Sequence, residues 1–329
     1  MTLQLGPAHK RAAEEAFNGF SSQLFSVPRD PSDPELSVEI HYLHRRSPRA
    51  SSPTLLLLHG HPQNHLIWHR VVGLLDAAEW NIVIPDIRGR GQSSIPLVSP
   101  SADALSAESA RYSKRSMARD NFELMRSLGY DTFYVVGHDR GGRVTHRLLA
   151  DYAAAVQKAI IIDIAPTIDM YTHANMRFAQ MYWHWFFLIQ PQPLPERFIS
   201  TNPDAYLQAC VSKFDPDQSI FTDWATASYL DGIRTEEQVH ALAEDYRASK
   251  PGGVDWLLDH SDRKEGKRIK TPVYLLWGDK GLVGGLYSGA LDWWRLTLDH
   301  VDGHGLDAGH YIPEEKPQDI ADAIKSFFA

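Results

Sequence analysis

The chain has 329 residues, of which 43% are hydrophobic and 22% are charged, a composition typical of a globular domain with a sizeable core. Its formal net charge of −8 at pH 7 disfavours nucleic acid and anionic membrane surfaces as partners, because both repel an acidic protein. The single cysteine, Cys210, excludes an internal disulfide framework, and we expect a buried small hydrophobe there. No apolar run approaches the roughly 18 residues of a membrane span, and the N-terminus lacks the pattern of a signal peptide. We therefore expect a cytoplasmic protein without a membrane or nucleic-acid partner.

The first 36 residues are predicted to be an N-terminal extension. A short helix is expected over Ala8–Phe17, and the stretch Arg29–Pro34 is rich in turn-forming residues that interrupt regular structure. Regular alternation of polar and apolar residues begins only at Ser37. The core domain is therefore expected to start at residue 37.

The next part of the chain alternates apolar strands with helices. Continuous apolar runs are typical of strands that are buried on both faces, and helices between such runs indicate a parallel sheet with crossover connections. Ligands of such sheets bind beyond the carboxyl ends of the strands. The strands are predicted at Ser37–Leu43, Thr54–Leu58, Asn81–Pro85, Thr132–Gly137 and Lys158–Ile164, with a helix at Ser113–Leu128.

The strand pattern stops between residues 167 and 250, where long aromatic helical stretches replace it. Examples are Tyr171–Gln190 and Glu236–Ser249. The α/β pattern resumes at Pro272–Gly278 and ends with an amphipathic helix at Pro317–Phe328. We therefore predict a helical cap domain over residues 167–250, inserted into a core domain formed by residues 37–166 and 251–329.

The run Phe133–Val136 breaks into Gly137-His138-Asp139-Arg140-Gly141-Gly142 and then continues with helical spacing. Strand, tight turn and helix in this order match the nucleophile elbow of α/β-hydrolases, where small flanking residues allow a strained turn that projects one side chain. Here that residue is Asp139, and a carboxylate at this position favours attack on an alkyl carbon over acyl transfer. The alternative is an ordinary strand–helix turn with Asp139 near an N-cap.

A nucleophile of this kind needs a base and a group that orients the base. His310, in the Asp-Ala-Gly-His-Tyr stretch after the last strand, is the candidate base. Many hydrolases of this fold carry the orienting acid a few residues after a strand ending in Trp-Gly, but here that position is Gly281. We therefore select Asp163, at the end of the preceding strand. Asp279 is the second choice, with a turn residue as its alternative interpretation.

Several separated motifs together resemble the α/β-hydrolase superfamily and, within it, the fluoroacetate (haloacetate) dehalogenase family. The resemblance covers roughly residues 38–329, including the cap. It implies the α/β-hydrolase fold, a mostly parallel sheet with flanking helices and an inserted helical cap, a homodimer, and a site without cofactor or metal. The matching stretches are 138–144, 184–187, 244–248, 277–281 and Gly309-His310-Tyr311 with Glu314-Glu315.

The resemblance also implies a role for each member of the site. Asp139 would displace halide from a halogen-bearing carbon in an SN2 step, and His310, oriented by Asp163, would activate water to hydrolyse the resulting ester. Backbone N–H groups of Arg140 and His61 would stabilise the oxyanion. Family members often carry an aromatic residue where His61 stands, so the pocket wall is expected to differ there.

Substrate recognition is assigned to two arginines and three cap residues. Arg140 and Arg143 lie one and four residues beyond Asp139, so both can face the site and clamp a carboxylate with bidentate geometry. The alternative for each is a surface salt bridge. The side chains of His184, Trp185 and Tyr246 are donors that could replace the hydration shell of a departing halide, and their alternative role is aromatic packing within the cap.

Three functions are therefore compatible with the sequence. The leading hypothesis is hydrolytic dehalogenation of a short 2-haloacid, a small anionic substrate. Epoxide hydrolysis uses the same Asp–His–Asp machinery but usually needs two cap tyrosines; Tyr246 is one candidate, and a clear second is missing. The third hypothesis is a non-catalytic ligand-binding protein on the same fold. Loss of a triad residue would favour it, yet all three candidates are present.

Overall fold

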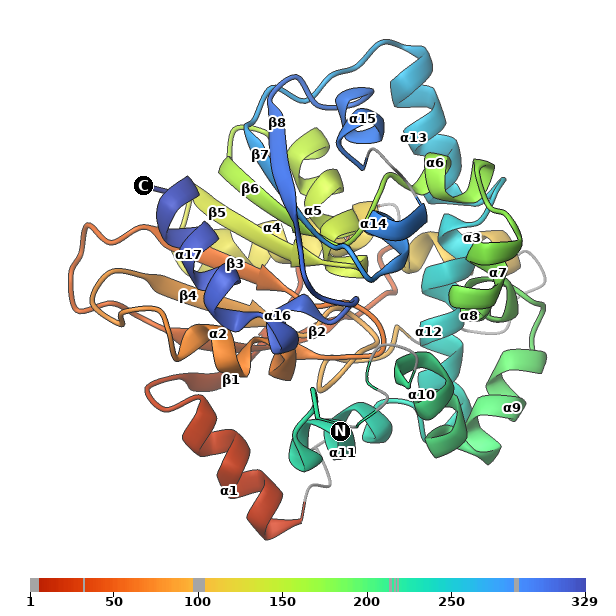
Figure 1. The fold of residues 1–329 in the computed structure, drawn as a ribbon, viewed down its shortest axis with the longest axis horizontal. Coiled ribbons are helices and arrows are strands. Elements are labelled where there is room, and N and C mark those ends of the chain that lie inside the picture. Colours follow the sequence, from red (N-terminus) through yellow and green to blue (C-terminus); the bar gives the residue numbers. More distant parts are fainter. Residues whose placement is uncertain are drawn as a thin grey trace.

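A computed structural model describes residues 6–31, 33–96, 104–212, 215, 217, 219–286 and 290–329. Its centre is an eight-stranded sheet with the strand order β1-β2-β4-β3-β5-β6-β7-β8 (Figure 1). Strand β2 pairs antiparallel with both of its neighbours, whereas the remaining pairs are parallel. The mostly parallel sheet with crossover helices is thus confirmed.

The central strands are buried because helices cover both faces of the sheet. All five residues of β3 and all five of β4 are buried, as their uninterrupted apolar sequences predict. The strands are β1 (Ser21–Ser26), β2 (Glu39–Arg45), β3 (Thr54–Leu58), β4 (Asn81–Pro85), β5 (Phe133–His138), β6 (Val156–Ile162), β7 (Val273–Gly278) and β8 (Val301–Leu306).

The helices form two groups. Those that precede residue 167 or follow residue 253 accompany the sheet: α1 (Pro7–Ala16), η1 (His65–Trp68), α2 (His69–Val72), α3 (Ala104–Arg111), α4 (Lys114–Ser127), α5 (Arg140–Asp151), α13 (Val254–Lys264), α14 (Leu282–Leu286), α15 (Ala290–Arg295), α16 (Ile312–Glu315) and α17 (Pro317–Phe327). The others form a second group, called the cap below, at the right and lower centre of Figure 1: α6 (Thr167–Thr172), α7 (Met176–Met181), α8 (Trp183–Leu188), α9 (Leu194–Thr201), α10 (Pro203–Val211), α11 (Asp223–Asp231) and α12 (Glu236–Ser249).

The N-terminal stretch contributes to the sheet, which the sequence did not predict. Helix α1 lies where a helix was expected, but Ser21–Ser26 then pairs antiparallel with β2 as an edge strand. Nearly every side chain of β1 is exposed, so the strand carries no apolar alternation that could be recognised. Phe17, between α1 and β1, is buried in the core.

The aromatic stretch Tyr171–Gln190 does not form one helix. It is divided among α6, α7 and α8, because Asn175 caps the start of α7 with its side chain and Tyr182 has a non-helical backbone between α7 and α8. In contrast, α12 has the predicted bounds and begins with a capping box formed by Thr235 and Gln238. Strand β8 was not predicted, since only one of its residues is buried and two are glycines.

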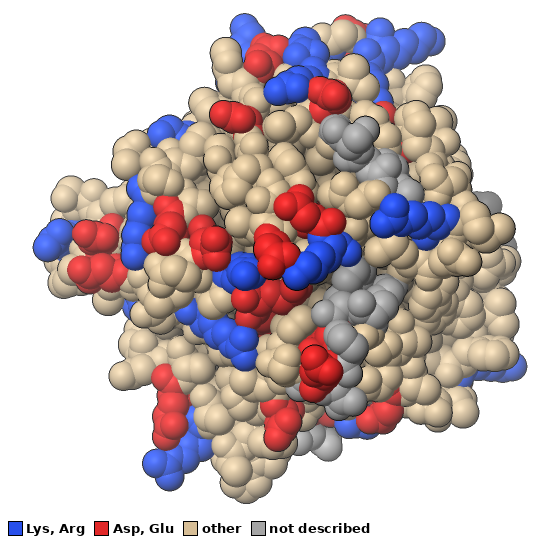
Figure 2. Space-filling view, in the orientation of Figure 1, with Lys and Arg blue, Asp and Glu red and all other residues tan. Residues whose placement is uncertain are grey.

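The surface carries both signs of charge. Figure 2 shows lysine and arginine side chains interspersed with aspartate and glutamate over the face in view, without one continuous basic area. Within the described ranges, none of the helices combines the length and the apolar character that crossing a membrane would require.

Candidate active site

The turn between β5 and α5 has the strained geometry of a nucleophile elbow. Asp139 has φ 49° and ψ −113°, a conformation that non-glycine residues rarely adopt. The flanking glycines are required by space: a Cβ at Gly137 would lie 2.4 Å from the Gly141 carbonyl oxygen, and one at Gly141 would lie 2.4 Å from the Leu58 carbonyl oxygen. The turn therefore holds the Asp139 carboxylate at the carboxyl end of the sheet, where it is 2% exposed.

His310 lies between two carboxylates. Its Nδ1 is 2.6 Å from Asp163 Oδ2, and its Nε2 is 3.9 Å from Asp139 Oδ2. The Gly278 N–H donates to Asp163 Oδ1 at 3.0 Å and fixes that carboxylate. Burial raises the pKa of Asp163, while the hydrogen bond from His310 opposes this effect. The Asp163 carboxylate orients the ring, so Nε2 faces the candidate nucleophile.

The structure brings Asp163, and not Asp279, to His310. Asp279 is exposed and accepts a hydrogen bond from the Trp277 indole at 3.1 Å. A Cβ at Gly281 would lie 3.4 Å from Asp163 Oδ2 and 3.2 Å from the Gly309 carbonyl oxygen. The Asp163 carboxylate thus lies beside Gly281, where a side chain would also press on the Gly278 carbonyl oxygen at 3.1 Å.

The loop after β3 provides a donor on the other side of the nucleophile. The backbone N–H of His61 donates to Asp139 Oδ1 at 2.9 Å. The ring of His61 stacks against that of His184, with 5.4 Å between centroids, and its Nε2 lies 3.1 Å from the Tyr206 hydroxyl. Burial lowers the pKa of His61 well below its ordinary value, so the ring is neutral at pH 7.

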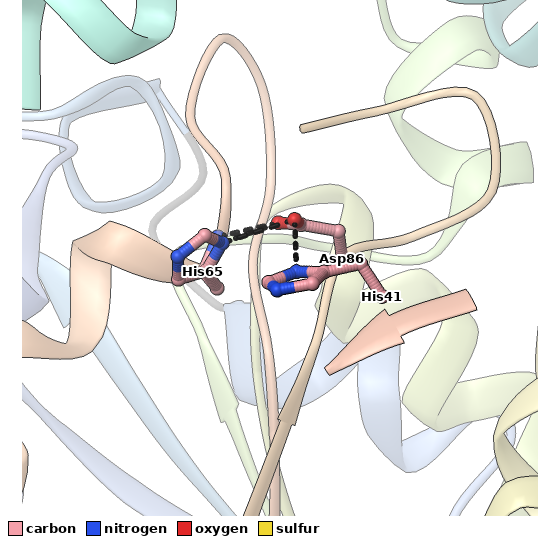
Figure 3. Close-up of side chains that lie close together, drawn as sticks. All are labelled: His41, His65 and Asp86. Atoms are coloured by element: carbon pink, nitrogen blue, oxygen red, sulfur yellow. Dashed lines mark hydrogen bonds and ion pairs between the residues drawn. The ribbon is translucent and has the colours of Figure 1, made fainter. Parts of the chain in front are cut away.

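A buried cluster around Asp86 holds this loop in place (Figure 3). The Asp86 carboxylate lies 2.9 Å from Nδ1 of His41 and from Nδ1 of His65, and it accepts the backbone N–H groups of His65 and Gln92. Burial raises the pKa of Asp86, but the two histidines outweigh burial and hold it well below its ordinary value. These atoms could also surround a metal ion, yet every contact is a hydrogen-bond distance and the carboxylate is saturated by N–H donors.

A second cluster with metal-ligand chemistry lies between α3 and the cap. Glu108, His240 and Glu244 place ligand atoms within 4.8 Å of one another. Both ring nitrogens of His240 face carboxylates, at 2.8 Å from Glu108 and 3.1 Å from Glu196. Two acceptors require two N–H donors, so the ring is protonated. Burial lowers the pKa of His240, but the neighbouring carboxylates raise it above its ordinary value. The carboxylates are therefore paired with the protonated ring, which leaves no ring nitrogen to bind a metal ion.

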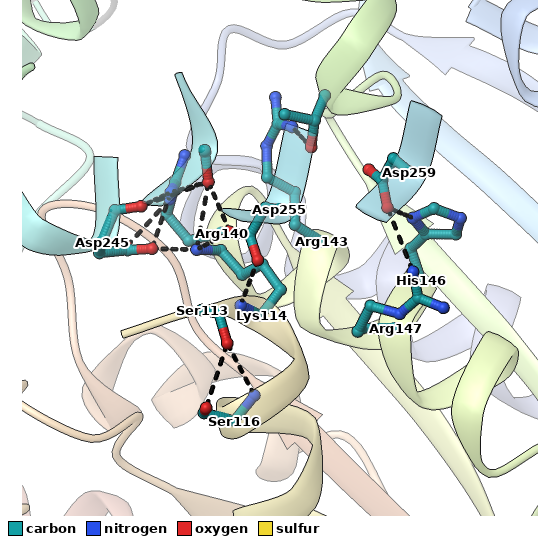
Figure 4. Close-up of polar contacts among 12 residues, drawn as sticks. Ser113, Lys114, Ser116, Arg140, Arg143, His146, Arg147, Asp245, Asp255 and Asp259 are labelled. Carbon is teal, nitrogen blue, oxygen red and sulfur yellow. Dashed lines mark hydrogen bonds and ion pairs between the residues drawn. The ribbon is translucent and has the colours of Figure 1, made fainter. Parts of the chain in front are cut away.

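Arg140 forms a buried ion pair, which neither of the sequence-based alternatives includes. Its Nε and Nη2 donate to the Asp245 carboxylate at 3.0 and 2.7 Å (Figure 4). Lys114 also bonds Asp245 and lies 3.5 Å from Asp255. Burial opposes ionisation of Asp245, but the two cations hold its pKa below the ordinary range. Only Nη1 of Arg140 is left without a partner in the described structure.

Arg143 lies apart from that cluster (Figure 4). It bonds the Thr167 hydroxyl and Met170 Sδ, and its guanidinium stands 4.9 Å from the centre of the Trp185 ring. In the part of the chain that the structure describes, no carboxylate lies within ion-pair distance of Arg143. Burial and the charge of Arg140 lower its pKa to about 10, so Arg143 is still a cation at neutral pH. A cation without an ion-pair partner among the described residues is thus buried four residues from Asp139, whose charge also acts on it.

The cap places aromatic donors over the elbow. The ring of Tyr246 lies 6.0 Å from those of His184 and Trp185 and 4.2 Å from the Arg140 guanidinium. Its hydroxyl is buried and has no hydrogen-bond partner among the described residues. Burial raises the pKa of Tyr246 well above its ordinary value, so the hydroxyl remains a proton donor. The residues predicted to bind substrate therefore lie either beside Asp139 or in the cap: His61, Arg140, Arg143, His184, Trp185 and Tyr246.

Three polar neighbours of the site were missed. Tyr182 places its hydroxyl 3.0 Å from His310 Nδ1, although the sequence shows only an aromatic cap residue. Asp245 forms ion pairs with both Lys114 and Arg140, across separations of more than 100 residues. Only Asp245 had a signal, since it lies inside one of the matching cap motifs.

An acid on a strained strand-to-helix turn, an aspartate–histidine pair and a helical cap define a hydrolase. A model of the alpha/beta hydrolase fold matches residues 53–317. A fluoroacetate dehalogenase from Burkholderia sp is 37% identical over 85% of this chain and 88% of its own length. A soluble epoxide hydrolase from Corynebacterium sp. (strain C12) is 29% identical over 84% of this chain and 90% of its own. The structure of ALR0039 from Nostoc sp PCC 7120 superposes with a TM-score of 0.83 at 40% identity, covering 95% of this chain and 99% of that one.

The chain belongs to the α/β hydrolase family. The identity to the dehalogenase confirms the predicted resemblance, and the epoxide hydrolase shows that more than one reaction occurs among similar proteins.

Proposed function

We propose that the protein is a hydrolytic dehalogenase of short 2-haloacids, of the fluoroacetate or haloacetate type. The observation that carries this proposal is Arg143, a buried cation without a carboxylate partner beside the candidate nucleophile. Burying a charge without a counter-ion is strongly unfavourable, so such a site is completed by an anion. A substrate carboxylate supplies that anion and places the adjacent carbon near Asp139.

The first step is an SN2 displacement. One oxygen of Asp139 attacks the carbon that bears the halogen, a C–O bond forms, and the halide leaves with the electron pair of the C–X bond. His61 donates its N–H to Oδ1 at 2.9 Å, which leaves Oδ2, the oxygen nearer His310, to attack. His184, Trp185 and Tyr246 then donate to the departing halide. Fluoride has the largest demand for such donors because it is the most strongly hydrated halide.

The second step hydrolyses the ester. His310 Nε2 takes a proton from a water molecule, which attacks the carbonyl carbon of the Asp139 ester. The imidazolium that forms is stabilised by Asp163, 2.6 Å from Nδ1. The backbone N–H groups of His61 and Arg140 stabilise the tetrahedral oxyanion. Collapse of this intermediate releases a 2-hydroxy acid and restores the Asp139 carboxylate.

Epoxide hydrolysis is the second candidate. It is favoured by the buried Tyr246 hydroxyl, which could protonate an epoxide oxygen, and by the epoxide hydrolase among the similar proteins. The second acid would be His184, whose ring lies 6.0 Å from that of Tyr246. A neutral epoxide, however, offers nothing to the charge of Arg143, so we rank this function below dehalogenation.

Two measurements test the proposal. Halide release is assayed with fluoroacetate, chloroacetate, bromoacetate and a small epoxide, and we expect release from at least one haloacid. Single-turnover reaction in heavy-oxygen water is followed by mass spectrometry of the peptide that contains Asp139. We expect label in Asp139, because water attacks the carbonyl carbon of the ester.

The outcomes separate the three functions. Turnover of the epoxide alone identifies an epoxide hydrolase, and absence of label with every substrate excludes the covalent mechanism and favours a binding protein. The matched variant is Asp139→Asn, for which we expect no turnover and an unchanged fold. Retained activity of this variant would contradict the role of Asp139.

We further propose that the protein is a cytoplasmic homodimer. The dehalogenase resemblance supports the dimer, and the single cysteine, Cys210, which is buried, suits a reducing compartment. Light scattering coupled to gel filtration measures the assembly: a mass of twice 37.1 kDa is expected, and a monomer at micromolar concentration would contradict the dimer.

A further inference from the structure

The loop after β4 directs one more arginine towards the site. Arg90 lies between Gly89 and Gly91, both of which have positive φ, 73° and 53°. A Cβ at Gly91 would lie 2.3 Å from the Asp86 carboxylate carbon, and one at Gly89 would lie 3.0 Å from Cβ of Ala241 on α12. The loop is thus pressed between the Asp86 cluster and the cap, so Arg90 has little freedom to turn outward.

Neighbouring contacts fix the loop further. Arg88 holds Asp120 through two hydrogen bonds of 2.5 and 2.6 Å, and the Ser93 hydroxyl donates to the Asp86 carbonyl oxygen at 2.7 Å. Arg90 itself is only 8% exposed. Its side chain is therefore held by the fold in the interior and is not a mobile surface group.

The guanidinium of Arg90, like those of Arg45 and Arg143, is buried without a salt bridge among the described residues. Arg88, Arg140, Arg147 and Arg247 each form a salt bridge with a carboxylate. Arg90 makes one hydrogen bond, from Nη2 to the Pro62 carbonyl oxygen at 3.2 Å, and its buried Nη1 has none. Across the described ranges no carboxylate approaches it within ion-pair distance.

Two other polar atoms without partners belong to His61 and Tyr246, both of which interact electrostatically with Arg90. Pro62, which Arg90 contacts, follows His61, and the rings of His61 and Tyr246 are 5.7 Å apart. Nδ1 of His61 and the hydroxyl of Tyr246 are both buried and have no partner in the described structure. If the Tyr206 hydroxyl donates to His61 Nε2, Nδ1 carries the proton and becomes a donor. Three hydrogen-bond donors without acceptors then lie close together: Arg90 Nη1, which carries the charge, His61 Nδ1 and the Tyr246 hydroxyl.

We propose that Arg90 and His61, beside Tyr246, form an anion subsite separate from Arg143, and that this subsite adds a cation to the cap donors that receive the halide released in the reaction. This inference rests on the proposed dehalogenase function. In the SN2 step Asp139 loses its negative charge as the ester forms, and the halide gains that charge together with the electron pair of the C–X bond. No proton moves in this step, so a fixed cation is needed where the halide arrives, and Arg90 supplies it.

The experiment uses the full-length protein and four forms of it: wild type, Arg90→Gln, Arg90→Lys and a matched control, Arg49→Gln, at an exposed position. Bromide binding is measured by quenching of tryptophan fluorescence and as product inhibition. Steady-state kinetics are measured with fluoroacetate and bromoacetate, and thermal unfolding verifies that each variant is folded.

We expect Arg90→Gln to weaken bromide binding at least tenfold, since a hydrogen bond to a charged group is lost. Turnover of fluoroacetate should fall more than turnover of bromoacetate, while KM for both changes less than twofold because Arg143 holds the carboxylate. Arg90→Lys should restore part of the bromide affinity, and Arg49→Gln should match the wild type.

Three results would overturn the inference. One is undetectable bromide binding in the wild type, and another is equal bromide affinity in Arg90→Gln and Arg49→Gln. The third is an Arg90→Gln variant that is no longer inhibited by a dicarboxylate such as malate but still binds bromide as the wild type does. Arg90 would then bind the second carboxylate of a substrate and not the halide. If the wild type releases no halide from any haloacid, the dehalogenase proposal fails, whereas bromide binding still reports on the subsite.

Discussion

Replacement of Asp245 by asparagine should test whether the buried ion cluster holds the cap on the core. Asp245 on α12 accepts hydrogen bonds from Arg140 at 2.7 and 3.0 Å and bonds Lys114, and all three side chains are at least 90% buried. The cluster of Arg140, Lys114, Asp245 and Asp255 is neutral, so the variant leaves one uncompensated buried cation. Breaking a buried pair in this way costs about 3–5 kcal/mol. We expect a loss of this size in the free energy of unfolding, measured by urea denaturation with an unchanged m-value.

The matched control is Glu236→Gln, an exposed acid at the start of the same helix, for which we expect a loss below about 1 kcal/mol. A double variant, Asp245→Asn with Lys114→Met, restores neutrality and should recover about 1–3 kcal/mol of the loss. If Asp245→Asn costs less than about 1 kcal/mol, or if the double variant is simply additive, the reasoning about charge balance is refuted.

Three further predictions concern the catalytic residues and the pH dependence of stability. His310→Gln should still form the ester but hydrolyse it at least about 100-fold more slowly, so the mass of the intact protein should show an accumulating adduct on Asp139. Asp163→Ala should reduce turnover strongly, and adding Gly281→Asp should restore part of it, since a Cβ at Gly281 lies 3.4 Å from Asp163 Oδ2 and the new carboxylate can enter the space that Asp163 vacates; no recovery would contradict the placement of both positions beside His310. Burial raises the pKa of Glu314 well above its ordinary value of 4.5. The contribution of protonated Glu314 to the folding stability is therefore fully present below pH 4.5 and is lost as the pH rises through the raised pKa. The melting temperature of Glu314→Gln should therefore exceed that of the wild type by more at pH 8 than at pH 5. The exposed control Glu79→Gln should show the same difference from the wild type at both pH values.

The sheet could be predicted where burial dominates the sequence. The runs Thr54–Leu58 and Asn81–Pro85 have the predicted bounds because strands covered on both faces must be apolar throughout. Strands β1 and β8 lie at the two edges of the sheet; β1 is largely exposed, and only Leu306 of β8 is fully buried. Their formation depends on backbone pairing with a neighbour, which leaves little trace in the local sequence.

The elbow was predictable for a similar reason, because its requirements are local. Close approach of backbone atoms demands glycine at 137 and 141, and the strained position between them projects one side chain. The state of Arg140 was not predictable, because it depends on Asp245, which is 105 residues away and comes from the cap. Proximity to the nucleophile in sequence placed both arginines near the site but could not tell which of them has a counter-ion.

That distinction leads to the substrate. If Arg140 and Arg143 were equally available, the site would carry two cations for one small anion. The ion pair with Asp245 commits the Nε and Nη2 groups of Arg140 to the protein, so Arg143 provides the charge and Arg140 contributes only Nη1. One full charge and one extra donor suit a single carboxylate. We therefore expect Arg143→Gln to raise KM for a haloacid about tenfold or more while leaving any epoxide turnover unchanged, and equal effects on both substrates would contradict this division of roles.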